Sequence, residues 1–133
     1  MPANTTPVFP LTPNNGVARL TTGITTRDTS VSTPSTIITG GTNGTVLNKI
    51  RVKAETDLAD SVVIIWLKIG GTWYLFDEFD VGDPATGSTT VGAYNEFRTY
   101  RDEILANGVI LGATITVTPT TGGCNVFGFG WDY

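Results

Sequence analysis

The chain has 133 residues, with 12 acidic and 8 basic residues and a formal net charge of −4. This length fits a single domain that can bury its own core. It contains no histidine and one cysteine, Cys124. These two facts exclude an internal disulfide and a zinc cluster, and they remove the commonest general base. The acidic balance argues against nucleic acid as a partner, and no apolar run is long enough for a membrane span. We expect a non-enzymatic binding protein that uses no cofactor and no metal.

Residues 1–16 are predicted to form an extended N-terminal arm. Prolines at positions 2, 7, 10 and 13 fix the backbone and remove hydrogen-bond donors, so neither a helix nor a central strand is expected there. The arm also carries three apolar residues, Val8, Phe9 and Leu11. Two interpretations stay open: a disordered terminus, or an arm that docks on a neighbouring subunit through these three side chains.

Residues 17–133 are predicted to form one all-β domain, an eight-stranded antiparallel β-sandwich with a jelly-roll-like arrangement. Apolar and polar residues alternate along this part of the chain, and turn residues interrupt the alternation at short intervals. The predicted strands span residues 17–25, 36–39, 46–54, 61–69, 72–81, 93–100, 109–117 and 125–133. Eight strands with long connections favour a jelly roll among the double-sheet folds.

Three segments of this domain have further local signals. Residues 61–69 are apolar on both faces, which is typical of a central strand covered on both sides. The pair Gly70-Gly71 after it predicts a two-residue hairpin turn. Residues 101–108 are compatible with one helical turn. In the last strand Gly128 and Gly130 alternate with aromatic residues, which indicates that something packs closely on the glycine side.

A basic stripe is predicted in the strand at 46–54, where Lys49, Arg51 and Lys53 occupy alternate positions and share one face. It is either a solvent-exposed sheet face or an electrostatic contact with an acidic neighbour. Because the chain is net acidic, we expect apolar contacts from the arm and the aromatic strands to contribute more to partner binding than this stripe.

Two other groups of residues are candidate sites. The acidic residues Asp77, Glu78, Asp80 and Asp83 are interpreted as a solvated loop edge, with a weak calcium site as the alternative. The aromatic residues are interpreted as core, with a carbohydrate-stacking platform as the alternative. That platform would use Trp66, Trp73, Tyr74, Phe76 and Tyr94.

Three segments make up most of the chain beyond the glycine-rich turn at residues 40–44. They are GTNGTVLNKIRVKAETD, then VVIIWLKIGGTWYLFDEFDV, then the C-terminal LANGVILGATITVTPTTGGCNVFGFGWDY. Over residues 44–133 this order resembles small virion structural proteins of tailed bacteriophages, of the capsid decoration or cement type.

The resemblance implies a non-enzymatic subunit that binds the major capsid protein, or another virion protein, and stabilises the capsid lattice. It also implies a homo-oligomer, with a trimer favoured because capsid lattices have three-fold axes. We expect synthesis in the host cytoplasm, location on the capsid surface of the virion, and no nucleic acid or membrane partner. The alternative is a carbohydrate-binding or receptor-binding module of a tail or head fibre.

Overall fold

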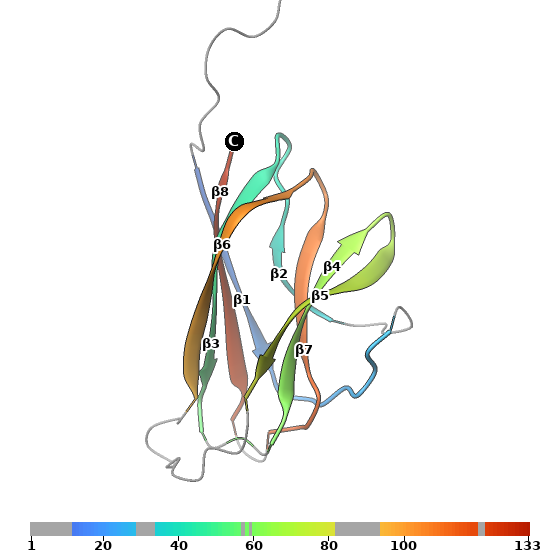
Figure 1. Ribbon diagram of the computed structural model, residues 1–133, viewed down its shortest axis with the longest axis vertical. Coiled ribbons are helices and arrows are strands. Elements are labelled where there is room, and N and C mark those ends of the chain that lie inside the picture. The colour runs from blue at the N-terminus through green and yellow to red at the C-terminus, as the bar shows by residue number, and fades with distance from the viewer. Residues whose placement is uncertain (1–11, 29–33, 57, 59, 82–93, 120–121) are drawn as a thin grey trace, which may run out of the picture.

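The computed structural model describes residues 12–28, 34–56, 58, 60–81, 94–119 and 122–133. This part of the chain is all-β, with eight strands and no helix. The strands are β1 (Thr12–Leu20), β2 (Ser35–Thr39), β3 (Thr45–Ala54), β4 (Val62–Ile69), β5 (Thr72–Asp80), β6 (Asn95–Leu105), β7 (Ile110–Ile115) and β8 (Cys124–Asp132). They form two four-stranded antiparallel sheets that face each other (Figure 1).

The first sheet has the strand order β1-β8-β3-β6 and the second has the order β2-β7-β4-β5. Apolar side chains at alternate strand positions fill the space between the sheets, since successive residues of a strand point to opposite faces. Members of this core from the first sheet are Leu47, Ile50, Val52 and Val126, and members from the second are Val63, Ile65, Leu111 and Ile115. Burying each such side chain contributes about 1.5–3 kcal/mol to folding.

The predicted central strand is confirmed as β4. It lies between β7 and β5 in the second sheet, and Ile64, Ile65 and Trp66 are fully buried although they point alternately to the two faces. The hairpin that follows it is also confirmed. Gly70 and Gly71 have φ values of +60° and +85°, which matches the hairpin turn that needs two left-handed residues.

The first strand begins earlier than expected, at Thr12 instead of Val17. Residues 12–16, which were assigned to the arm, therefore pair with β8. This strand is at the edge of its sheet, where Pro13 is tolerated. The apolar arm residues Val8, Phe9 and Leu11 lie outside the described residues, so their docking role stays a prediction.

The helical turn suggested for residues 101–108 is wrong, because β6 continues to Leu105. The register of β6 against β3 shifts between the pairs Lys49–Thr99 and Leu47–Glu103, so β6 has extra residues there. Asp102 takes a positive φ of 63°. A bulge of this kind bends a strand while keeping it in the sheet. It interrupts the alternation of apolar and polar residues, so the sequence pattern did not predict that the strand continues.

Among the described residues no helix could span a membrane.

Candidate interaction face

The outward side chains of the first sheet lie in register across all four strands. The antiparallel pairings place residues of β6, β3, β8 and β1 side by side in rows, while the intervening residues point into the core. In that strand order the rows are Asn95–Lys53–Asn125–Arg19, Phe97–Arg51–Phe127–Val17, Thr99–Lys49–Phe129–Asn15 and Ile104–Val46–Trp131–Pro13. These rows are called the exposed face below.

Large apolar side chains are concentrated on the exposed face. Its most accessible members are Val17 (52% exposed), Phe97 (55%), Ile104 (58%) and Trp131 (42%). Phe127 and Phe129 lie between them, half-buried, with ring centroids 6.3 Å apart. Scattered exposed apolar residues are normal, but a contiguous group of them marks an interaction surface.

Two of the cations on this face lie over its aromatic rings. The Lys49 Nζ atom is 5.5 Å from the Phe97 ring centroid and 5.1 Å from that of Phe129. The Arg51 Cζ atom is 5.2 Å from the Phe97 centroid, and Arg51 Nη1 donates to Asn95 Oδ1 at 2.8 Å. Each cation–π contact contributes about 0.5–1 kcal/mol at an exposed site. The rings therefore hold both charged groups in place on the surface.

The rows of the exposed face contain no carboxylate. Glu55, just beyond β3, pairs with Arg19 at one end of the face, with 2.6 Å between Arg19 Nε and Glu55 Oε2. The hydrogen bond from Arg19 holds the pKa of Glu55 below its usual value. Within the described part of the chain, neither Lys49 nor Arg51 forms an ion pair. Lys53 Nζ donates to the Ala54 carbonyl at 2.8 Å.

The predicted basic stripe and the aromatic last strand thus occupy one face. The sequence suggested them separately, because Arg51 and its neighbour Phe127 come from distant strands and no local pattern indicates their pairing. The glycine side of β8 behaves as predicted. A Cβ atom added at Gly128 would lie 2.8 Å from side-chain atoms of Ile37 and of Ile38, so β2 packs directly on this bare backbone.

Part of the outer face of the second sheet is covered by the chain itself, while Leu75, beside Trp66 on that face, is 41% exposed. Ile64, Trp66 and Trp73 form a second apolar cluster there, and Ile24 of the segment that follows β1 packs against it. The Ile24 N–H donates to the Ile115 carbonyl at 2.7 Å, which attaches this segment, residues 21–28, to β7. We call residues 21–28 the covering segment.

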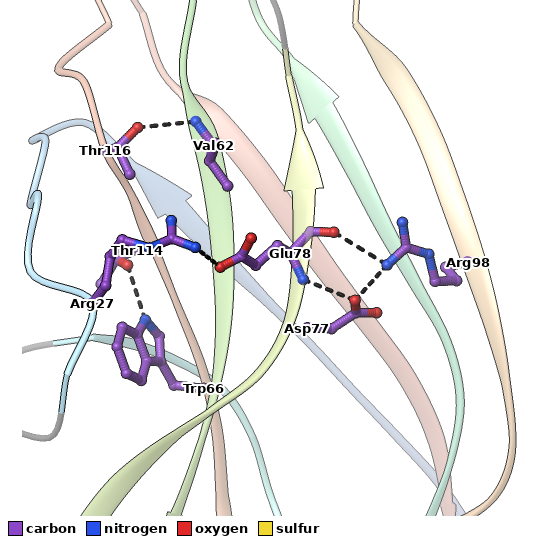
Figure 2. Close-up of polar contacts among 8 residues, drawn as sticks. All are labelled: Arg27, Val62, Trp66, Asp77, Glu78, Arg98, Thr114 and Thr116. Carbon is purple, nitrogen blue, oxygen red and sulfur yellow. Dashed lines mark hydrogen bonds and ion pairs between the residues drawn. The ribbon is translucent and has the colours of Figure 1, made fainter.

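Polar contacts fix the covered face further (Figure 2). Arg27 of the covering segment forms an ion pair with Glu78 of β5. Beneath the segment, Trp66 Nε1 donates to Thr114 Oγ1 at 2.9 Å, which satisfies the indole N–H in the absence of water. Trp66 is 0% exposed and Trp73 8%. The two tryptophans suggested for a carbohydrate platform are therefore packed away from solvent, whereas Tyr74 of that set is 50% exposed.

The residues of the predicted acidic cluster have different roles in the structure. A bulge displaces Phe76, so that Asp77 points inward and Glu78 outward. Asp77 Oδ2 accepts from Tyr100 OH at 2.6 Å, and Asp77 Oδ1 accepts from the Glu78 N–H at 2.8 Å. Arg98 Nη1 also donates to Asp77, and to the Glu78 carbonyl at 3.1 Å (Figure 2). These bonds connect β5 of the second sheet to β6 of the first.

Electrostatics support this cross-sheet clamp of Asp77, Arg98 and Tyr100. Burial alone would raise the pKa of Asp77, but the hydrogen bonds from Tyr100 and Arg98 outweigh burial and leave the pKa below its usual value. Burial, followed by the hydrogen bond to Asp77, raises the pKa of Tyr100. The described residues contain no group of three or more potential ligands for a metal ion, and Asp83 lies outside them.

The single cysteine is part of the core. Cys124 is buried at the start of β8, and burial raises the pKa of its thiol to about 12. A thiol that stays protonated at neutral pH is a poor nucleophile. Comparison with protein-family models, with curated proteins and with solved structures found no match to this chain.

Proposed function

We propose that this protein is a non-enzymatic structural protein of a bacteriophage virion, a decoration or cement subunit that binds the major capsid protein. The observation that carries the proposal is the contrast between the two sheets. The chain covers the cluster of Ile64, Trp66 and Trp73 on its second sheet, whereas exposed apolar and charged side chains extend across all four strands of its first. A contiguous surface of this kind is what a subunit needs if it works by contact with another protein.

The strand order supports the jelly-roll part of the proposal. The first strand pairs with the last, the second with the seventh, the third with the sixth and the fourth with the fifth. A chain that is folded in half at the β4–β5 hairpin and then rolled into two sheets has these pairings, and double-sheet jelly rolls are common in viral capsid proteins.

The proposed mechanism is additive contact energy. Each subunit would contribute one exposed face, and a homo-oligomer, with a trimer favoured, would present several faces to a lattice with matching symmetry. Linking several weak contacts raises the overall affinity by orders of magnitude, provided that all of them can be made at once. In this way a small domain with few charged residues could stabilise a shell.

A carbohydrate-binding or receptor-binding module remains the second candidate, because Phe97 and Trp131 are accessible aromatic side chains. Sugar stacking needs a free ring face, however. Lys49 and Arg51 both approach the Phe97 ring, which leaves less of that ring for a sugar. A protein interface therefore fits the exposed face better than a sugar-binding site does.

The test is to measure whether the protein is a component of purified phage particles. A fixed copy number that matches a lattice position, together with a trimer in size-exclusion chromatography with light scattering, would support the proposal. Absence from particles, or binding to a glycan array with no affinity for capsids, would contradict it.

A further inference from the structure

We infer that the exposed face recognises an acidic protein surface that also presents apolar side chains. That the partner is a protein rests on the proposed assembly function. The chemistry by which the face recognises it can be tested independently of that function. It assigns distinct tasks to named groups: Lys49 and Arg51 receive carboxylates, while Phe97, Trp131 and Ile104 receive apolar side chains.

Positive charge is concentrated on the exposed face of this chain. The exposed face holds Arg19, Lys49, Arg51 and Lys53, which is half of the chain's eight basic residues. None of the acidic residues in the described part of the chain belongs to its rows. A protein with a net charge of −4 therefore presents a face of the opposite sign, and complementary potentials across an interface select the partner and speed the encounter.

Neighbouring side chains already position the cations of the exposed face. Lys49 lies between two rings, at 5.5 Å and 5.1 Å from their centroids. Arg51 is held both by the Phe97 ring at 5.2 Å and by the Asn95 side chain. Long cationic side chains normally lose conformational freedom on binding, and prior positioning lowers that cost. A carboxylate can approach each charged group from the solvent side without displacing an ion pair.

The rings of the exposed face are poorly suited to nucleic-acid and sugar ligands. Single-stranded nucleic acids and sugars stack on free ring faces, whereas Phe127 and Phe129 are half-buried and the Phe97 ring already contacts two cations. Two of the accessible residues at the edges of the face, Val17 and Ile104, are aliphatic and pack well only against other apolar side chains. These features favour a protein surface.

The experiment measures binding to soluble polymers of defined chemistry. The probes are a fluorescent random copolymer of glutamate and tyrosine as the acidic and apolar ligand, polyglutamate, oligothymidylate, and a neutral xylan oligosaccharide. The variants are K49E/R51E and the milder K49Q/R51Q. The control for a lysine reversal is K68E, because Lys68 of the second sheet lies over the Trp73 ring at 5.6 Å and so undergoes the same charge reversal and the same kind of ring-contact loss as Lys49.

We expect the wild-type protein to bind the glutamate–tyrosine copolymer more tightly than polyglutamate, and more weakly as salt rises. K49E/R51E should weaken this binding at least tenfold and K49Q/R51Q by a smaller factor, while K68E stays within about twofold of wild type. An equal loss in K68E, no binding to either acidic polymer, or tighter binding to oligothymidylate or xylan would overturn the inference. Because no capsid is used, these results are independent of whether the protein is found in virions.

Discussion

The outer faces of the two sheets carry similar residues but differ in how far their side chains are exposed to solvent. Each presents aromatic and aliphatic side chains at alternate positions of long strands. In the second sheet the covering segment packs over the cluster of Ile64, Trp66 and Trp73, and Trp66 is 0% exposed. In the first sheet no described segment packs over the corresponding positions, and Trp131 is 42% exposed.

An alternating aromatic pattern therefore indicates a sheet face, but it does not indicate whether that face is covered by the chain or exposed to solvent. An aromatic residue stabilises the fold when a loop of the same chain covers it, and it is available to a partner when none does. Substitutions on the two faces should therefore change the free energy of unfolding by different amounts.

The largest contrast is expected between tryptophans on the two faces. Trp66→Ala removes a fully buried side chain and leaves the Thr114 hydroxyl without its donor, so it should cost about 3–5 kcal/mol. Trp131→Ala should cost less than about 1 kcal/mol, the usual range for a surface change. Urea unfolding of both variants measures the difference. Equal destabilisation would mean that the two faces are not distinct.

The cross-sheet clamp should matter next. Asp77→Asn removes a carboxylate that accepts hydrogen bonds from Tyr100 and Arg98, and a cost of about 1–3 kcal/mol is expected. The pKa of Asp77 is lowered in the folded protein. Its contribution is therefore present above the unfolded pKa of about 3.9 and is lost as pH falls through the folded value.

Unfolding measured from neutral pH down to the acid range tests this second prediction. The wild-type protein should lose part of its stability below about pH 4, near the unfolded pKa of aspartate, and the Asp77→Asn variant should lose less over the same range. Parallel pH profiles for the two proteins would exclude Asp77 as a contributor.

A change on the inner side of the first sheet sharpens the assignment of its faces. Gly128→Ala places a methyl group 2.8 Å from side-chain atoms of Ile37 and of Ile38, and overpacking of this kind costs about 1–3 kcal/mol. Thr99→Ala on the exposed face is the control and should change stability by about 0.5 kcal/mol or less. A neutral Gly128→Ala variant would show that β8 does not pack against β2 in this way.

The smallest effect is expected at the covering segment. Arg27→Ala removes the ion pair with Glu78, and exposed ion pairs contribute only about 0.2–1 kcal/mol. The loss should still loosen the segment over Trp66 and Trp73. In a Trp131→Phe background, acrylamide should therefore quench tryptophan fluorescence more strongly once Arg27 is replaced. Unchanged quenching would argue that Ile24 alone holds the cover in place.

The sequence indicates those parts of this fold that depend on local pattern. The doubly apolar β4 and the turn at Gly70-Gly71 were identified because each carries its own signal. The end of β6 was missed, since the bulge at Asp102 interrupts the alternation of an edge strand. The start of β1 was misplaced because four prolines suggested an arm up to residue 16.

The candidate site was only half predictable. Lys49, Arg51 and Lys53 were identified as a stripe from their spacing in one strand. Their place beside Phe97 and Phe127 depends on pairing among β6, β3 and β8, which are far apart in the chain. The covering of Trp66 by residues 21–28 is likewise a tertiary effect. That segment is polar except for Ile24, so its sequence gives little indication that it packs on a sheet.

Chemical labelling of single introduced cysteines tests most directly whether the exposed face is the surface that a partner covers. Thr99→Cys places a thiol on the exposed face, Thr36→Cys places one on the second sheet, and both native threonines are accessible. The native Cys124 is buried and should contribute little background. Maleimide reaction rates are compared for the free protein and for the protein bound to purified capsids. We predict strong protection at position 99 and none at position 36; protection at position 36 with a free thiol at position 99 would contradict the account.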